Sequence, residues 1–171
     1  VLSLSDKEIT LDGVPVTDDL SSPVHTGAEL VYYRDGTDET YGEGEAWEKH
    51  TQQEAAQHRV VTITRPGTYR LSGTLSRGQI AVDLGENAAA DPEAVVTLVL
   101  DGADVTCTVA PALIFYNVYE CGSKDTDTAG AQVDTRGAGA NIVLAAGSEN
   151  TFTGSHVGPG MLALFFQGKH R

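Results

Sequence analysis

VVTITRPGTYRLSGTLSRGQIAVD at positions 60–83, VVTLVLDGADVTCTV at 95–109 and ALIFY at 112–116 make up the stretch that decides the fold. β-Branched and other apolar residues fill short runs, and Gly, Pro or Asp closes each run after four to eight residues. Runs of this kind, separated by turn residues and without a helical period between them, are typical of β-strands. The sequence therefore predicts an all-β protein made of many short strands.

A loose repeat runs through these strands. Leu71, Leu100 and Leu144 each end an apolar run that then turns through a glycine, and the intervals between them are 29 and 44 residues. Solenoid repeats of roughly 20–30 residues are common, and the longer interval fits if the polar, Gly-rich segment 121–139 is a loop inserted into one coil. The repeat favours a parallel β-helix. A β-sandwich is the alternative, because regularly spaced short strands suit it too.

The first 58 residues are predicted to form an N-terminal region of strands and loops. Asp12 and Gly13 stand between two alternating runs, which is a hairpin signal, and Pro15 would place the second strand at a sheet edge. A further strand is expected from Ala28 to Tyr33. Glu45 to His58 is the helical candidate, and its thin apolar stripe predicts a short surface helix or a long loop.

The charge of the chain restricts its partners. The 24 acidic residues outnumber the 11 basic ones, which gives a net charge of −13. Nucleic acid is not expected as a partner, because phosphate binding needs a positive surface and no Lys/Arg cluster is present. Membrane insertion is not expected either, since the longest late apolar run, Met161 to Phe166, is six residues long.

Two cysteines, Cys107 and Cys121, are fourteen residues apart. They could form a disulfide across one turn or remain two buried thiols, and the sequence leaves both open. Cys107 shares strand parity with Val105 and Val109, which favours an inward-facing side chain.

Three phrases of the sequence together resemble a known family. They are Val61–Leu75, Gln79–Asp83 and Val96–Thr106, and Gly147–Thr153 looks like the next turn. In this order they are similar to the clostridial polygalacturonate-binding β-helix proteins, a family of carbohydrate-binding domain-containing proteins. The resemblance covers roughly residues 58–155. The ending, 158–171, does not look like the continuation of that family.

The resemblance implies a fold, a function and a location. The fold would be a right-handed parallel β-helix like that of pectate lyases, over residues 59–157, with 1–58 as an N-terminal cap region and 158–171 as an atypical tail. The function would be calcium-assisted, non-catalytic binding of an acidic plant polysaccharide such as polygalacturonate, or of cellulose. The protein would be bacterial and secreted or attached to the cell surface.

No catalytic constellation is visible, so the chain is not expected to be an enzyme. It has no Gly-x-Ser-x-Gly, no phosphate loop and no His-Glu-x-x-His. A calcium-dependent polysaccharide lyase, the enzymatic alternative, would need an Arg or Lys base beside calcium carboxylates. Arg70 and Arg136 are the arginines near acidic strand ends, and nothing ties them to that role.

Calcium is the expected cofactor, because it takes several oxygen ligands and this chain has clustered carboxylates. Asp125 and Asp127 begin a segment that starts like an EF-hand loop but lacks its later ligands. Asp83, Asp101 and Asp104 follow or flank strands and could align across coils. For Asp101, which precedes a glycine, plain turn chemistry is the other interpretation.

Aromatic residues are the candidate sugar platforms: Tyr69, Tyr116 and Trp47. Each could instead be a packing residue, since buried aromatics supply much of a core's energy. A structural or adhesive module that binds protein partners is the alternative function. In that case the exposed end of the β-helix, or Met161 to Phe166, could serve as a self-association contact.

Overall fold

The computed structural model describes residues 1–28, 30, 50–119 and 137–155, and in this part the chain is nearly all β. Helix is confined there to α1 (Gln52–Ala55) and the short 3-10 turn η3 (Ala88–Ala90). The strands are β1 (Leu2–Leu4), β2 (Thr10–Leu11), β3 (Val14–Pro15), β4 (Val24–Thr26), β5 (Arg59–Ile63), β6 (Gly67–Leu75), β7 (Gly78–Asp83), β8 (Val96–Cys107), β9 (Leu113–Asn117), β10 (Ala140–Leu144) and β11 (Thr151–Gly154).

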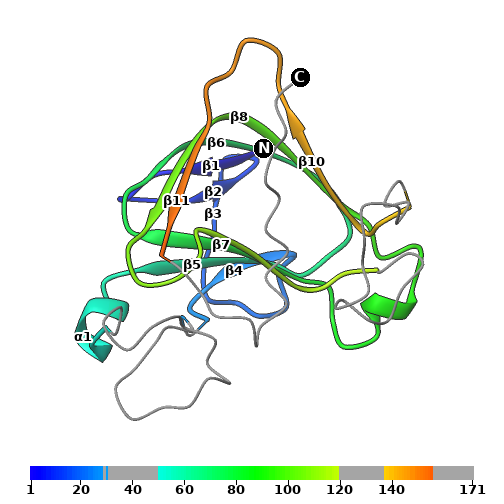
Figure 1. Ribbon diagram of the computed structural model, residues 1–171, viewed down its shortest axis with the longest axis horizontal. Coiled ribbons are helices and arrows are strands. Elements are labelled where there is room, and N and C mark those ends of the chain that lie inside the picture. Colours follow the sequence, from blue (N-terminus) through cyan, green and yellow to red (C-terminus); the bar gives the residue numbers. More distant parts are fainter. Residues whose placement is uncertain (29, 31–49, 120–136, 156–171) are drawn as a thin grey trace.

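The strands form two sheets around one interior (Figure 1). The large sheet has the order β10-β8-β6-β1-β2-β3, with β11 also paired to β8, and the small sheet has the order β4-β5-β7-β9. From β5 to β9 the chain alternates between the two sheets, and each strand pairs in parallel with the strand two places further on. The N-terminal strands add antiparallel pairs to both sheets. The all-β prediction is confirmed, and two open, mixed sheets on one core are compatible with the β-sandwich alternative.

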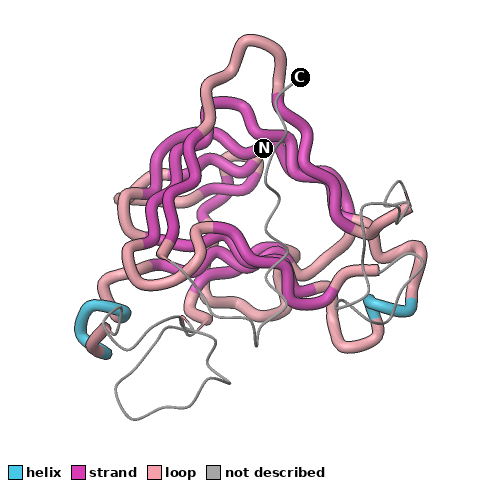
Figure 2. The backbone as a smooth tube through the Cα atoms, viewed as in Figure 1, coloured by secondary structure: helices cyan, strands magenta, loops and turns pink. Residues whose placement is uncertain are grey.

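The leucine repeat has a direct counterpart in the strand register. Leu71 and Leu144 are both opposite Leu100 in neighbouring strands, and Leu2 is opposite Leu71. Leu2, Leu71 and Leu100 are buried. The three glycine turns that follow the leucines of the repeat therefore lie at the same level of the large sheet. Figure 2 shows the strands stacked one behind another around the interior.

The large sheet bends where β6 and β8 each pass through a glycine. The register between these strands shifts between Leu71 and Gly73, so that Asp101 and Gly102 oppose a single residue. Gly102 has φ +77° and Gly73 has φ +94°, which is the conformation of a bulge with glycine in the left-handed region. The Asp101-Gly102 pair therefore bends a continuous strand. The sequence pattern predicted that Asp or Gly closes each run, but β8 continues through both.

The N-terminal segment is bound to both sheets. Asp12 and Gly13 both have positive φ and join β2 to β3, with Leu11 opposite Val14, as a two-residue hairpin turn of type I′ requires. The predicted hairpin is confirmed, and β3 with Pro15 lies at the edge of the large sheet. The Asp6 carboxylate accepts hydrogen bonds from the Ser76 amide (2.8 Å) and hydroxyl (2.6 Å). These two hydrogen bonds, the hydroxyl's first, lower the pKa of Asp6.

Two predicted elements of the N-terminal region differ from the structure. The helical candidate is reduced in the described residues to α1, which Thr51 and Glu54 begin with a reciprocal capping box. The predicted strand from Ala28 to Tyr33 lies mostly outside the described residues, and Ala28 itself is in no strand. The nearby strand is β4, whose three residues are too few to show an alternating pattern.

Within the described part of the chain, no helix is both long and apolar enough to span a lipid bilayer.

Cys107 lies in the core at the end of β8. It is a free thiol, 1% exposed, and its strand neighbour Val105 is buried beside it. The inward orientation predicted from strand parity is therefore confirmed. Cys121 lies outside the described residues.

The Cys107 thiol is expected to react slowly with thiol reagents in the folded protein. Burial raises its pKa, and amide hydrogen bonds from Val109 and Ala110 offset only part of that rise. The test uses a Cys121→Ser variant and an aromatic disulfide reagent at pH 8. The reaction with Cys107 should be at least ~100-fold slower without denaturant than in 6 M urea. The reason is that the thiolate is the reactive form and that the buried side chain must first be exposed. Equal rates in both solvents would show that the end of β8 is open.

Candidate functional site

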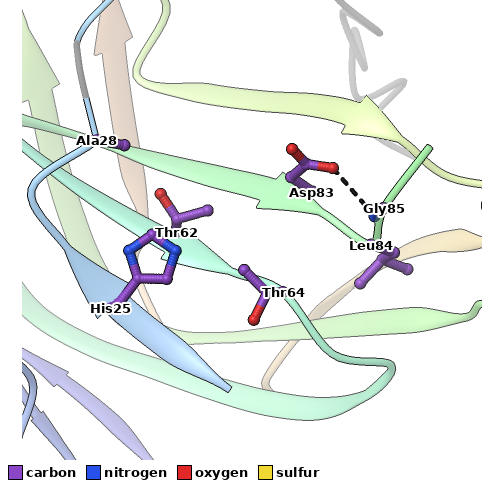
Figure 3. A pocket seen from close by; sticks show the side chains of 7 residues that line it. All are labelled: His25, Ala28, Thr62, Thr64, Asp83, Leu84 and Gly85. Atoms are coloured by element: carbon purple, nitrogen blue, oxygen red, sulfur yellow. Dashed lines mark hydrogen bonds between the residues drawn. The ribbon is translucent and has the colours of Figure 1, made fainter. Parts of the chain in front are cut away.

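A cleft of about 380 Å³ lies on the outer face of the small sheet, where β5 and β7 end. Its described lining combines polar and small apolar side chains (Figure 3): His25, Ala28, Thr62, Thr64, Asp83, Leu84 and Gly85. Three segments that are far apart in the sequence therefore supply one concave surface.

The alternation of the strands explains why these side chains face outward. Val61 and Ile63 of β5 point into the core and are fully buried, so Thr62 between them points to the other face. The antiparallel register places His25 of β4 directly opposite Thr62. Asp83 ends β7 next to the end of β5. The alternation of Val61, Thr62 and Ile63 and the register between β4 and β5 thus place Thr62 and His25 side by side on this face.

Asp83 is held in a defined orientation. Its Oδ1 accepts one hydrogen bond from the Gly85 amide (3.1 Å) and one from Nδ2 of Asn117 on β9 (2.8 Å). Among the described residues, all hydrogen bonds to this carboxylate go to Oδ1. The second oxygen, Oδ2, is therefore left as an acceptor for a bound molecule.

Thr62 carries an unpaired polar atom at the same cleft. It is 6% exposed, and its hydroxyl Oγ1 has no hydrogen-bond partner among the residues that the structure describes. Leaving a buried hydroxyl unpaired costs about 1–3 kcal/mol. Thr64 is different, because its hydroxyl donates to the Ser22 carbonyl over 3.1 Å. Thr62 is thus the hydroxyl of the cleft that a ligand could satisfy.

His25 and Tyr116 extend the polar surface on either side. His25 is 6% exposed, and its Nδ1 lies 3.3 Å from the Thr26 carbonyl oxygen. Tyr116 on β9 is 36% exposed. Burial, followed by the negative charge of Asp83, raises the pKa of Tyr116. The next residue on β9, Asn117, is opposite Asp83, so Tyr116 lies on β9 beside the Asp83 end of the cleft.

The cleft is suited to binding a hydroxyl-rich molecule. It offers a carboxylate oxygen, an unpaired hydroxyl and an imidazole, with Leu84 and Ala28 as apolar contacts and Tyr116 nearby. Small-molecule sites generally combine apolar walls with a few fixed polar groups in this way. Within the residues that the structure describes, no three His, Cys, Asp or Glu side chains come together to hold a metal ion.

The acidic side chains predicted to align across coils do not share one site. Asp83 is on the small sheet, whereas Asp101 and Asp104 are on β8 of the large sheet. Asp101 forms an ion pair with Arg70 over 2.6 Å, with both side chains well exposed. Asp104 is exposed and opposite Thr74. The structure does not bring these three carboxylates together, because Asp83 belongs to one sheet and Asp101 and Asp104 belong to the other.

The predicted aromatic platforms differ in how exposed they are. Tyr69 is 9% exposed, belongs to the core, and donates its hydroxyl to the Arg65 carbonyl over 3.0 Å. Its ring therefore packs in the core and is not a platform on the surface. Tyr116 keeps enough exposed surface for the predicted role. Trp47, Asp125, Asp127 and the segment Met161 to Phe166 lie outside the described residues.

Three residues of the cleft, His25, Thr62 and Thr64, were not predicted from the sequence as site residues. Isolated threonines in a strand carry no functional signal, and a single histidine is usually a surface residue. The information lies in the pairing of β4 with β5, which brings the three residues to one face. A sequence pattern within one strand cannot show that pairing.

Comparison with known proteins adds an independent observation. A family model described as "carbohydrate-binding domain-containing protein" matches residues 57–157, which is more than half of the chain. The chain belongs to this carbohydrate-binding domain family. The matched segment contains Thr62, Asp83 and Tyr116, while His25 lies outside it.

A bacterial relative agrees with the family. A carbohydrate-binding domain-containing protein of Acetivibrio thermocellus is 48% identical over 50 residues, a segment that makes up 29% of this chain and 15% of the relative. The match thus spans only a small part, 15%, of the length of that relative. No solved structure matches the chain.

Proposed function

We propose that this domain binds a polysaccharide without cleaving it, and that the cleft between His25, Thr62 and Asp83 holds one of its sugar residues. The observation that carries the proposal is the unpaired, buried Thr62 hydroxyl in a cleft that also presents a free carboxylate oxygen. A sugar hydroxyl can donate to one of these groups and accept from the other. Membership of a carbohydrate-binding family supports the same ligand class.

Tyr116 is proposed as the stacking surface at the Asp83 end of the cleft. Its ring is partly exposed and is fixed on β9, whose neighbouring residue Phe115 is buried in the core. An aromatic ring held in this way offers a large apolar contact at little cost in side-chain entropy.

Binding is favoured over cleavage by the composition of the cleft. A polysaccharide lyase would need an arginine or lysine base beside its substrate, and the described lining residues include neither. Calcium assistance is proposed for an acidic ligand, because the domain has a net charge of −13 and an anionic polymer would be repelled without a bridging cation. The carboxylates Asp125 and Asp127 are the candidates for that cation.

We further propose that the two sheets are parts of a right-handed parallel β-helix on a secreted or surface-attached protein. The alternation of strands between sheets, their parallel pairing and the leucine register support the coil. Parallel strands joined by a crossover connection are right-handed in about 98% of cases, which supports the hand. An experimental structure with the opposite hand, or with antiparallel neighbours from β5 to β9, would contradict this.

Replacing Thr62 with valine is expected to weaken polysaccharide binding while leaving the fold at least as stable. Valine has the same shape, so the substitution removes the unpaired hydroxyl and with it the cost of burying it. The affinity for the bound polymer should fall about 5- to 10-fold, the equivalent of one hydrogen bond. Affinity electrophoresis in gels with defined polysaccharides, with and without EDTA, measures the binding, and urea denaturation measures the stability.

Thr97→Val is the matched control for this experiment. Thr97 is likewise a strand threonine, but it is only partly buried and lies on the large sheet, away from the cleft. It should bind as the unchanged protein does. Failure of every polysaccharide to retard the protein, or equal effects of the two substitutions, would refute the proposed site.

A further inference from the structure

We infer that His25 makes the binding of an acidic polysaccharide stronger at mildly acidic pH, because its protonated ring can pair with a uronate carboxylate in the cleft. The inference rests on the proposed function, since it assigns a role to one residue of the same site. His25 lines the cleft and lies outside the segment that the family model matches. The geometry of the cleft, and not the family match, therefore supports this role.

A neighbouring carbonyl group determines which ring nitrogen of His25 carries the proton. Nδ1 lies 3.3 Å from the Thr26 carbonyl oxygen, and a carbonyl oxygen can only accept, so Nδ1 is the donor. Nε2 is then the unprotonated nitrogen of the neutral ring, and it gains a proton when the ring becomes charged. Protonation therefore changes Nε2 from an acceptor into a charged donor.

Nε2 of His25 is accessible from the cleft. Among the described residues it has no hydrogen-bond partner. It is not enclosed either, because the unpaired side-chain atoms without solvent contact belong to His50, Thr62 and Gln79. Figure 3 shows the ring of His25 beside Thr62 in the lining of the cleft. A molecule bound in the cleft can therefore reach this nitrogen.

Thr62 supplies a second donor beside the ring. It is directly opposite His25 in the antiparallel pair of β4 and β5, and the Cβ atoms of residues placed in this way are about 4.5–5.5 Å apart. Its unpaired hydroxyl can donate to one oxygen of a carboxylate while the protonated Nε2 donates to the other. The charged ring and the hydroxyl together thus suit a uronate, whereas the neutral ring offers it no donor at Nε2.

Three other charged side chains lie on the segments packed against β4. Asp19 precedes this strand, and its pKa is lowered by the hydroxyl of Ser21 first, then by the Ser21 amide, and least by the positive charge of His25. Arg65 follows β5 and donates to the Ser21 carbonyl over 2.7 Å, and Asp83 ends β7 in the same cleft. Histidine is the side chain that ordinarily changes its charge between pH 5 and 8, so His25 is the group expected to change the charge of the cleft in this range.

Polygalacturonate and its fully methyl-esterified form test the inference, since they share one backbone and differ in charge. The full chain is run by affinity electrophoresis at pH 5.5 and 7.5 in millimolar calcium, and each retardation is measured against a polymer-free gel at the same pH. Polygalacturonate should bind roughly 10-fold more tightly at pH 5.5, the equivalent of one hydrogen bond to a charged group. The affinity for the ester should change by about 2-fold or less, because it has no charged carboxylate.

His25→Gln removes the titrating ring and keeps a polar side chain. Its affinity for polygalacturonate should differ by about 2-fold or less between the two pH values. His58→Gln is the matched control, because it removes an imidazole that lies between α1 and the turn after β8, where Nε2 accepts from the Thr108 amide over 3.2 Å. This control should keep the roughly 10-fold pH dependence. Urea denaturation at both pH values checks that each variant is folded.

The outcomes distinguish a failure of this inference from a failure of the proposed function. A pH dependence that His25→Gln removes and His58→Gln keeps supports the inference. Equal affinity at both pH values, the same pH effect for the ester, or a pH effect that survives in His25→Gln overturns it, while weaker binding by Thr62→Val at both pH values still supports the site. If neither galacturonan nor a neutral β-glucan retards the protein at either pH, the proposed function itself is refuted.

Discussion

Replacing Gly73 with alanine is expected to destabilise the protein by about 3–5 kcal/mol, because two penalties coincide at this position. Gly73 has φ +94°, a conformation that costs an L-amino acid about 1–2 kcal/mol. An added Cβ would also lie 2.2 Å from the carbonyl oxygen of Leu4 in the neighbouring strand. That oxygen belongs to the backbone, so β1 would have to move away from β6. Leu2 and Leu4, which are buried, would then lose part of their packing.

Gly102→Ala separates the two penalties. Gly102 occupies the corresponding bulge of β8 with φ +77°, but nothing lies within 4 Å of its added Cβ. This substitution should cost only about 1–2 kcal/mol, the price of the backbone conformation. Chemical denaturation of both variants measures the difference, and limited proteolysis reports whether the N-terminal strand has detached. A loss for Gly73→Ala no greater than that for Gly102→Ala would show that β1 does not pack closely at this point.

Asn150→Ala is expected to destabilise the protein by about 2–3 kcal/mol. The side-chain oxygen of Asn150 accepts hydrogen bonds from the amides of Gly102 and Ala103, both over 2.9 Å, at the bend of β8. Ala103 is fully buried, so water cannot easily replace the lost acceptor at its amide. Asn150 also donates to the Ser148 hydroxyl over 2.8 Å. The bend of one strand is therefore stabilised by a side chain from the loop between β10 and β11.

Asn150→Asp tests whether the acceptor is what matters. A carboxylate keeps an oxygen for both amides and loses only the donor to Ser148, so most of the stability should remain at neutral pH. Thermal and urea denaturation of the two variants side by side give the comparison. If aspartate proved as harmful as alanine, the two amide hydrogen bonds would not be the reason for the asparagine.

Local patterns in the sequence predicted several elements closely. Apolar runs between turn residues predicted short strands, of which β6 is one, and the Asp12-Gly13 pair predicted the observed hairpin. Leu71, Leu100 and Leu144, which recur in the sequence before a glycine, are in register in three neighbouring strands. These features depend on residues close together in the chain, or on a spacing that recurs.

Features that depend on pairing between distant segments could not be predicted in this way. Asp101-Gly102 was expected to end a strand, because an Asp-Gly pair is found in turns as well as in bulges. Only the register, in which both residues are opposite Ser72, identifies this pair as a bulge. Asp83 and Asp104 look equivalent as acidic residues beside strands, yet they end on different sheets. The cleft depends on His25 of β4 standing opposite Thr62, and β4 is too short to be recognised from its own residues.

The loop between β10 and β11 has a practical consequence. Leu144 is opposite Leu100, and Thr151 is opposite Asp104. Between these two pairs β8 has three residues, whereas the chain from β10 to β11 has six, 145–150. Ala145 and Ser148 hydrogen-bond to the Leu100 carbonyl and anchor the start of the excursion. This corner accommodates a change in length without disturbing the register on either side, and doubling a flexible loop adds only about 0.6 kcal/mol of closure entropy. A peptide tag or epitope inserted between Ser148 and Glu149 would thus be displayed outward from a rigid support, provided that Ser148 and Asn150 are left in place.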